Sequence, residues 1–287
     1  MSLILDHVSF IYGQGTGEEK KALDDISLEI REQEMIALIG HTGSGKSTLV
    51  QLFNGLEMPT MGTVYFNGRD ISEKDFSKRE LRGKVGLVFQ YPEYQLFEES
   101  VIKDVQFGPK NMGFRQLDVE MYSFQALKDV GIGDDLLDAS PLMLSGGQKR
   151  RVAIAGVLAM QPEILVLDEP MAGLDPAGRK EILNLLKKLH QEKKMTVFFI
   201  SHNMEEVAET AERVLVMHQG KIVLDGTPEK IFQYEAELEK IGLGVPQTAS
   251  FAKRLEKKGW RFSKNPVTTD QMVAEIMGRW NGGKHDS

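Results

Sequence analysis

The sequence predicts an α/β protein with a mixed central sheet. Two short apolar runs, Ile164–Leu167 and Thr196–Ile200, have the length and continuity of strands that are buried on both faces of a parallel sheet. A third run, Met35–Ile39, leads into a glycine-rich stretch and then into the helical pattern Leu49–Phe53. We therefore expect parallel strands covered by helices, with the glycine-rich stretch at the carboxyl end of one strand.

An antiparallel β subdomain is expected at the start of the chain. Apolar and polar residues alternate over Leu3–Phe10 and again over Ile26–Ile30, and the glycines of Gly13–Gly17 mark the turn between them. Gly62–Gly68 is a further short strand that ends in a turn, and Val85–Phe89 is a buried strand. The composition then becomes helical and polar, which predicts an inserted helical subdomain at about residues 101–160.

The last part of the core is expected to be a hairpin. Its strands are Val214–Met217 and Lys221–Leu224, joined by His218–Gly220. Thr227 followed by Pro228 predicts a capped helix start after it. We place the end of the core domain at residue 238, so that residues 1–238 form one domain and residues 239–287 a C-terminal extension.

Composition excludes several classes of protein. The 287 residues are 41% hydrophobic, enough for a sizeable core, and they include neither a run of about 18 apolar residues nor a signal-peptide pattern. With no cysteine, the chain has neither disulfides nor thiolate metal sites. A net charge of −7 argues against a nucleic-acid partner. These properties suit a cytosolic protein, alone or docked to a membrane partner.

The glycine-rich stretch has the pattern of a nucleotide phosphate loop. Its glycines allow consecutive backbone N–H groups to curl around an anion, Lys46 can reach the β and γ phosphates, and the Ser47 hydroxyl is placed to ligate Mg²⁺. The predicted ATP-binding residues of this stretch are Gly40, His41, Thr42, Gly43, Ser44, Gly45, Lys46, Ser47 and Thr48.

Two acidic residues follow the run Ile164–Leu167. Asp168 is expected to hold Mg²⁺ through its water shell, and Glu169 is placed to polarise an attacking water as a general base. An acidic corner between a strand and a loop is the alternative reading. The phosphate loop earlier in the chain favours the catalytic one.

Leu144–Gln148 opens a helix that we expect to run from Lys149 to Met160. With this pentapeptide the chain resembles the nucleotide-binding subunit of an ATP-binding-cassette (ABC) transporter, in which Leu-Ser-Gly-Gly-Gln is the family signature. The resemblance implies an ABC-type fold in which two subunits enclose two ATP molecules. Ser145, Gly147 and Gln148 then face the γ-phosphate held by the other subunit, as a helix N-terminus suited to an anion.

The same resemblance assigns further site residues. Tyr12 matches the aromatic residue that stacks on adenine, although a buried strand tyrosine is a live alternative. Gln90 matches the glutamine that senses Mg²⁺ and the attacking water. Asp175, in Ala172–Asp175, matches the aspartate that crosses the dimer interface. His202 matches the histidine that contacts the γ-phosphate and holds Glu169 in register.

Longer segments are similar to one type of ABC transporter. Phe89–Val101, Phe107–Asn111, Arg151–Met160 and the C-terminal extension resemble the ATPases of energy-coupling factor (ECF) transporters, in particular the second of their two paralogous subunits. This implies an ATP hydrolase at the cytoplasmic face of the cell membrane. Its implied partners are a paralogous ATPase, a shared transmembrane coupling protein and interchangeable substrate-binding membrane subunits, for uptake of vitamins or other micronutrients. A different ABC importer, or an ABC ATPase outside transport, is the alternative.

Three surface expectations remain. Glu93–Glu99 combines acidic and aromatic residues and is expected to form an acidic-rimmed apolar groove for a basic helix of the membrane protein. Lys149–Arg151 is expected to be a solvated helix face. Residues 246–287, with eight Lys or Arg against four Asp or Glu, are assigned to contact with the partner ATPase or to packing on their own domain, with Trp280 among their apolar residues.

Overall fold

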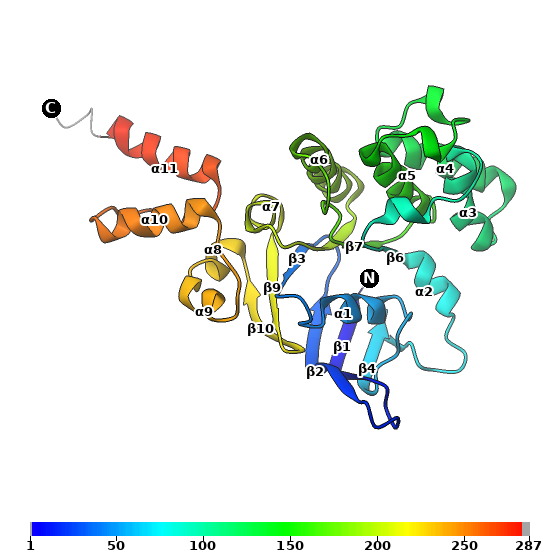
Figure 1. Ribbon diagram of the computed structural model, residues 1–287, viewed down its shortest axis with the longest axis horizontal. Helices are drawn as coiled ribbons and strands as arrows, with labels where there is room; N and C mark the ends of the chain where they lie inside the picture. Colours follow the sequence, from blue (N-terminus) through cyan, green and yellow to red (C-terminus); the bar gives the residue numbers. More distant parts are fainter. Residues whose placement is uncertain (1, 283–287) are drawn as a thin grey trace.

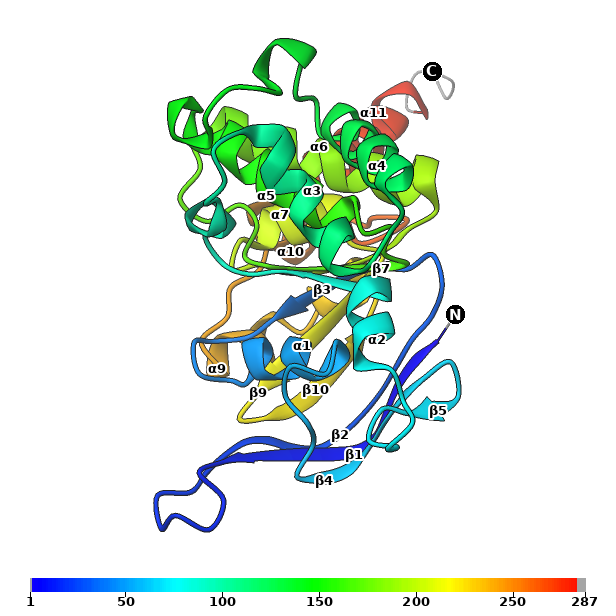
Figure 2. The same ribbon diagram turned by 90° about the vertical axis from the view of Figure 1, so that its right-hand side faces the viewer.

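A computed structural model describes the backbone of residues 2–282 and the side chains of residues 2–278. Residues 283–287 and the side chain of Trp280 lie outside the described residues. Two sheets lie one above the other, with one helix between them and most other helices on the far side (Figure 2). This confirms the predicted α/β class with a mixed central sheet, an antiparallel β subdomain and several helices.

The smaller sheet is antiparallel and has the order β2-β1-β4-β5. Its pairing matches the expected hairpin, because Leu3 pairs with Ile30 and Tyr12 with Lys20. The strands are β1 Leu3–Tyr12, β2 Lys20–Ile30, β4 Met61–Phe66 and β5 Arg69–Asp70.

The larger sheet has the order β10-β9-β3-β8-β7-β6. Five of its strands are parallel, and β10 pairs antiparallel with β9 as the predicted hairpin. The strands are β3 Met35–Ile39, β6 Val85–Val88, β7 Ile164–Asp168, β8 Thr196–Ile200, β9 Arg213–His218 and β10 Lys221–Gly226.

Both faces of this sheet are buried, which explains why its central strands are apolar throughout. On one face, Ile36, Leu38 and Phe198 pack against α1 (Lys46–Phe53) and the smaller sheet. On the other face, Ala37 and Phe199 belong to a core that includes residues of the covering helices.

Two groups of helices lie at opposite ends of the molecule. Figure 1 shows α3, α4 and α5 together at one end of the longest axis and α10 and α11 at the other. After α1, the remaining helices are α2 Lys78–Lys84, α3 Val101–Asn111, α4 Gln116–Asp129, α5 Gly146–Leu158, α6 Pro176–Lys193, α7 Met204–Thr210, α8 Pro228–Ile231, α9 Glu235–Lys240, α10 Gln247–Lys257 and α11 Thr269–Gly282.

Two predicted helix starts need correction. The helix after the pentapeptide begins at Gly146 rather than Lys149, because Ser145 caps it and the two glycines form its first turn. Thr227 precedes the four-residue helix α8, but its side chain makes no capping hydrogen bond. Its neighbour Pro228, at the first helical position, supplies the pre-set backbone angle instead.

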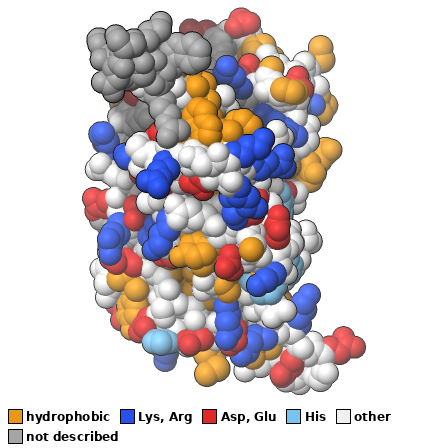
Figure 3. Space-filling model, turned by 90° about the vertical axis from the view of Figure 1, so that its left-hand side faces the viewer, with side chains coloured by type: hydrophobic (Ala, Val, Ile, Leu, Met, Phe, Trp, Pro, Cys, Tyr) orange, Lys and Arg blue, Asp and Glu red, His pale blue; other side chains and the backbone are white. Residues whose placement is uncertain are grey.

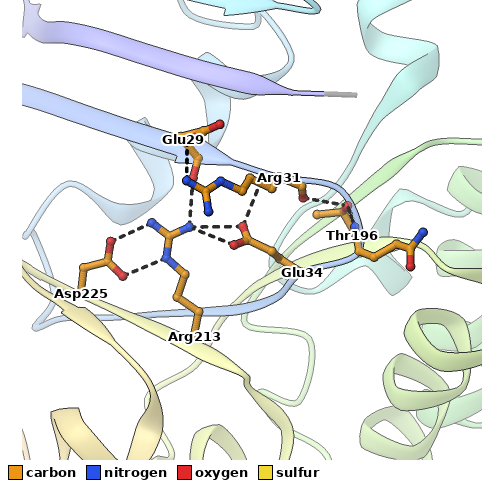
Figure 4. Close-up of polar contacts among 7 residues, drawn as sticks. Glu29, Arg31, Glu34, Thr196, Arg213 and Asp225 are labelled. Atoms are coloured by element: carbon orange, nitrogen blue, oxygen red, sulfur yellow. Dashed lines mark hydrogen bonds and ion pairs between the residues drawn. The ribbon is translucent and has the colours of Figure 1, made fainter.

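An ion-pair network joins the two sheets at the amino ends of the parallel strands (Figure 4). Arg213 of β9 makes a bidentate pair with Asp225 of β10, at 2.7 and 2.8 Å, and donates to the Glu29 carbonyl of β2 at 3.0 Å. Its Nη1 also lies 3.2 Å from Glu34, in the turn between β2 and β3. In the same turn, the Arg31 carbonyl accepts a hydrogen bond from Thr196 of β8. The network thus lies at the edge of the sheet opposite the predicted site, whose residues follow the carboxyl ends of the strands.

Candidate active site

The glycine-rich loop lies between the carboxyl end of β3 and the first turn of α1. Gly43 and Gly45 have φ values of 81° and 105°, a backbone region that side chains rarely adopt. Gly45 occupies the N-cap position of α1, so the loop turns directly into the helix. The backbone N–H groups that begin α1 have no earlier turn to bond to, and such groups form an anion-binding end.

Two glycines bring the loop against the neighbouring strands. A Cβ atom at Gly40 would lie 2.4 Å from the carbonyl oxygen of Met217, and one at Gly45 would lie 2.5 Å from that of Ala22. Gly220 also donates a hydrogen bond to the Ser44 carbonyl, at 2.9 Å. The loop is thus held in shape by packing on β2 and β9.

The polar atoms inside the loop are suited to an anion. Lys46 is 7% exposed, and its Nζ donates to the carbonyl oxygens of Gly40 and His41, at 2.7 and 3.0 Å. Burial lowers the pKa of Lys46, while the carboxylates of Glu169 and Asp168 act in the opposite direction. Among the described residues, the buried Ser44 hydroxyl has no hydrogen-bond partner. A buried ammonium and an unpartnered hydroxyl beside open N–H groups fit a bound phosphate chain.

Asp168 brings a carboxylate to the start of α1. It is the last residue of β7, and its side chain accepts a hydrogen bond from the Ser47 hydroxyl. Burial raises the pKa of Asp168, and the Ser47 hydrogen bond opposes that rise. The partly buried carboxylate and the hydroxyl are both hard oxygen donors.

Glu169 is fixed by its backbone and by two side chains. Its φ of 50° lies in the left-handed region, which is uncommon for a residue other than glycine and typical of functional sites. Glu169 Oε2 accepts from Gln90 Nε2 at 3.1 Å, and Oε1 lies 2.6 Å from His202 Nε2. Gln90 follows β6 and His202 follows β8, the two neighbours of β7. Parallel pairing therefore brings three residues that are distant in sequence to one point.

A cavity of about 260 Å³ opens beside Glu169. His202 and Arg179 line it, together with residues of the turn after Glu169. The space lies where a reactant could approach the carboxylate.

Tyr12 lies beside the phosphate loop, and His41 belongs to the loop itself. Tyr12 is 41% exposed, which excludes the buried strand tyrosine that the sequence left open. Its hydroxyl lies 2.9 Å from Thr48 Oγ1, and its ring packs edge-on against Phe10. His41 Nδ1 contacts the Thr42 carbonyl at 2.7 Å, and its ring lies 5.1 Å from that of His218.

The signature residues form a separate helix start. Ser145 accepts from the Gln148 N–H at 3.3 Å, and the Gln148 side chain accepts from the Ser145 N–H at 2.9 Å. Added Cβ atoms at Gly146 and Gly147 would meet nothing within 4 Å, so this helix end is open. In the described part of the chain, each of these side chains bonds to the backbone N–H of the other residue and not to the phosphate loop. Asp175 similarly caps α6, accepting from Gly178 at 2.8 Å.

The prediction that Lys149–Arg151 forms a solvated helix face is wrong for the two arginines. Arg150 is 1% exposed and pairs with Glu93, and Arg151 pairs with Glu181 of α6. For the same reason Glu93 is no part of an acidic rim, because its carboxylate points at a buried guanidinium. Helical spacing carried the signal, since Arg150, Ile154 and Leu158 are buried at intervals of four residues.

Comparison with known proteins identifies relatives over the whole length. Residues 23–172 match the ABC transporter family. The chain is 50% identical to an energy-coupling factor transporter ATP-binding protein EcfA2 of Caldanaerobacter subterraneus subsp. tengcongensis, over 99% of this chain and 100% of that one. It is 51% identical to the protein of that name from Clostridium tetani, over 98% of each.

Solved structures agree with the fold. CbiO1 of Clostridium perfringens, described as part of the ABC transporter complex cbiONQ, matches with a TM-score of 0.73 and 39% identity, over 83% of this chain and 93% of that one. The ATP-binding cassette MJ0796, solved as a dimer in a post-hydrolysis state bound to ADP and Pi, matches with a TM-score of 0.68 and 29% identity, over 78% and 98% of the two chains.

Replacing Gly45 with Ala tests whether the shape of the phosphate loop is needed to bind ATP. We expect the Kd for ATP to rise at least about tenfold, because the strained backbone costs on the order of 1–3 kcal/mol and the new Cβ would displace the loop from Ala22. Isothermal titration calorimetry measures the change. Gly15→Ala is the matched control, since Gly15 also has a positive φ but open space around it. Equal affinity for ATP in the two variants would show that the loop does not bind the phosphates.

Proposed function

The chain belongs to the ABC transporter family as an ATP-binding subunit of the energy-coupling factor type, and we propose that Glu169 is the general base of its ATP hydrolysis. The geometry around its carboxylate carries this assignment. A base works when its orientation is fixed before reaction, and here the Gln90 amide and the His202 imidazole hold both carboxylate oxygens. The strained backbone of Glu169 adds a third restraint.

Gly40–Thr48 would bind the phosphates of ATP. The Lys46 ammonium, which now donates to two loop carbonyls, would donate to phosphate oxygens instead. Burial makes this exchange favourable, since a partly desolvated ammonium gains more from an anion than from a carbonyl. Tyr12, exposed beside Thr48, would stack on the adenine ring.

Ser47, Asp168 and Gln90 would hold Mg²⁺. The described residues include no group of three or more His, Cys, Asp or Glu placed around one point, which fits Mg²⁺ better than a metal held by protein alone. Mg²⁺ takes few protein ligands and completes its shell with phosphate oxygens and water. When bound, it neutralises charge on the phosphates during transfer to water.

Ser145, Gly147, Gln148 and Asp175 would act on ATP held by a second ATPase subunit. They lie on α5 and at the start of α6 and make no hydrogen bond to this chain's own phosphate loop. The open helix end at Gly146 and Gly147 leaves room for an anion from outside. The dimer of MJ0796 is a precedent for such pairing. We propose a paralogous ATPase as the partner.

The 90–99 loop would dock a transmembrane coupling protein. Tyr94 and Phe97 are 84% and 64% exposed, and Phe97 packs edge-on against Phe107 of α3. Asp104 holds the loop by accepting from the Phe97 and Glu98 N–H groups, at 3.3 and 3.1 Å. Exposed aromatic residues on a fixed loop are typical of an interface.

No helix among residues 2–282 is long and apolar enough to cross a bilayer. Attachment to the cytoplasmic face of the membrane would therefore come from docking to membrane subunits. Those subunits would also choose the solute, for which we propose vitamins or other micronutrients.

Residues 239–287 would form a C-terminal module that contacts the partner ATPase. A cavity of about 660 Å³ is lined by residues of both α10 and α11, and Phe251, Val273 and Met277 are exposed along these helices. On this side of the molecule, Lys and Arg side chains lie to the right of and below a strip of hydrophobic ones (Figure 3). An apolar strip with a charged margin resembles the anatomy of protein interfaces.

Glu169→Gln tests the base. We expect kcat for ATP hydrolysis to fall by about 10²- to 10⁴-fold while the Kd for ATP changes little, because the amide keeps the shape but cannot take a proton. A coupled phosphate-release assay gives kcat. Glu163→Gln is the control, since Glu163 lies at the other end of β7 in a surface pair with Lys84. A wild-type rate in Glu169→Gln would refute the assignment.

Phe97→Ser tests the docking surface. We expect membrane subunits to be lost from the affinity-purified complex, because an exposed anchor residue is removed, while ATP binding persists. Leu117→Ser provides the comparison, since Leu117 is also an exposed apolar residue, at 72%, but lies on α4. Co-purification that survives in Phe97→Ser would show that the subunits dock elsewhere.

A further inference from the structure

Arg150 is a buried charge that the proposed catalytic steps do not use. Among the side chains that the structure describes, it is the largest that is fully buried, at 1% exposed. Burying a guanidinium costs much of its hydration energy, and a buried ion pair stabilises a fold poorly compared with apolar residues of the same volume. Its position therefore calls for a reason other than stability.

The donors of Arg150 are divided between two segments. Nε and Nη2 donate to the two carboxylate oxygens of Glu93, at 3.0 and 2.6 Å. Nη1 donates to the carbonyl oxygens of Pro170 and Ala172, at 3.0 and 2.6 Å. Because the guanidinium is planar and rigid, these four bonds fix one segment relative to the other.

Each segment carries a residue of the site. Glu93 lies three residues after Gln90, in the 90–99 loop. Pro170 directly follows Glu169. Arg150 itself lies two residues after Gln148, on α5. One side chain thus ties the signature helix, the Gln90 loop and the Glu169 turn together.

We propose that Arg150 is a positioning residue that sets the distance between Gln90 and Glu169. This rests on the proposed role of Glu169 as the base. A shift of the Glu93 end moves Gln90, and a shift of the Pro170 end moves Glu169, so loss of the guanidinium loosens the 3.1 Å hydrogen bond between them. The same link carries any displacement of the exposed 90–99 loop, including Tyr94, to the base.

Arg150→Lys tests whether the planar guanidinium, with its several donors, is needed to hold the two segments. A lysine keeps the charge but cannot reach Glu93 and two carbonyls together. We expect kcat to fall about 10- to 100-fold, with the Kd for ATP nearly unchanged, because a small displacement of a base is sufficient for such a loss. Arg151→Lys is the matched control on the same helix, since Arg151 pairs with the half-exposed Glu181 outside the site.

A double variant separates positioning from stability. In Glu93→Gln with Arg150→Met, no charge remains buried, so we expect the melting temperature to recover relative to either single variant. Positioning predicts that kcat per folded molecule stays low in the double variant, with the folded fraction taken from circular dichroism. A purely structural role predicts that kcat recovers with stability.

Two results would overturn the proposal. One is a wild-type kcat in the double variant, and the other is an Arg150→Lys rate equal to that of Arg151→Lys. Glu169→Gln, assayed in the same series with the full-length chain and its partners, tests the base by itself. A normal rate there combined with slow Arg150 variants would reject Glu169 as the base and leave Arg150 as a positioning residue for a different one.

Discussion

Parallel pairing brings the carboxyl ends of β3, β6, β7 and β8 to one edge of the sheet. Val88 pairs with Leu167, Asp168 with Ile200, and Leu38 with Ile200. A residue one or two positions beyond the end of each strand therefore reaches the same region: Gly40, Gln90, Glu169 and His202. Burial of both faces fixes this register, since a slip by one residue would exchange the side chains of the two cores. The catalytic geometry follows from the packing of strands that contain almost no polar residue.

The strands and the main motifs were predictable because their signals are local. Apolar runs of four or five residues predicted β3, β7 and β8, and the loop around Lys46 was recognisable from its own nine residues and the apolar runs on either side of it. Those signals gave the fold class, which the structure and the relatives confirm. The roles of the site residues stay predictions, although the structure brings Gln90, Glu169 and His202 into contact.

Arg150 shows where local reasoning fails. In the run Lys149–Arg151 three cations look like a solvated face, and Glu93 in an acidic segment looks like a surface rim. Arg150 is buried and Glu93 partly buried because they pair with each other, and they lie 57 residues apart. The exposure of Tyr12 likewise depends on how β1 packs beside α1, so it could not be predicted from the residue itself.

The buried Arg150 also makes the folding of one part of the chain depend on the folding of another. Until Glu93 and the Pro170 carbonyl are in place, moving the guanidinium out of water leaves a charge without a partner, which is strongly unfavourable. The three segments belong to the core sheet and to the inserted helices, so neither part can finish packing alone. Closing the helical insertion onto the core and shaping the turn after Glu169 are therefore energetically coupled, so a change that opens one of them also weakens the other.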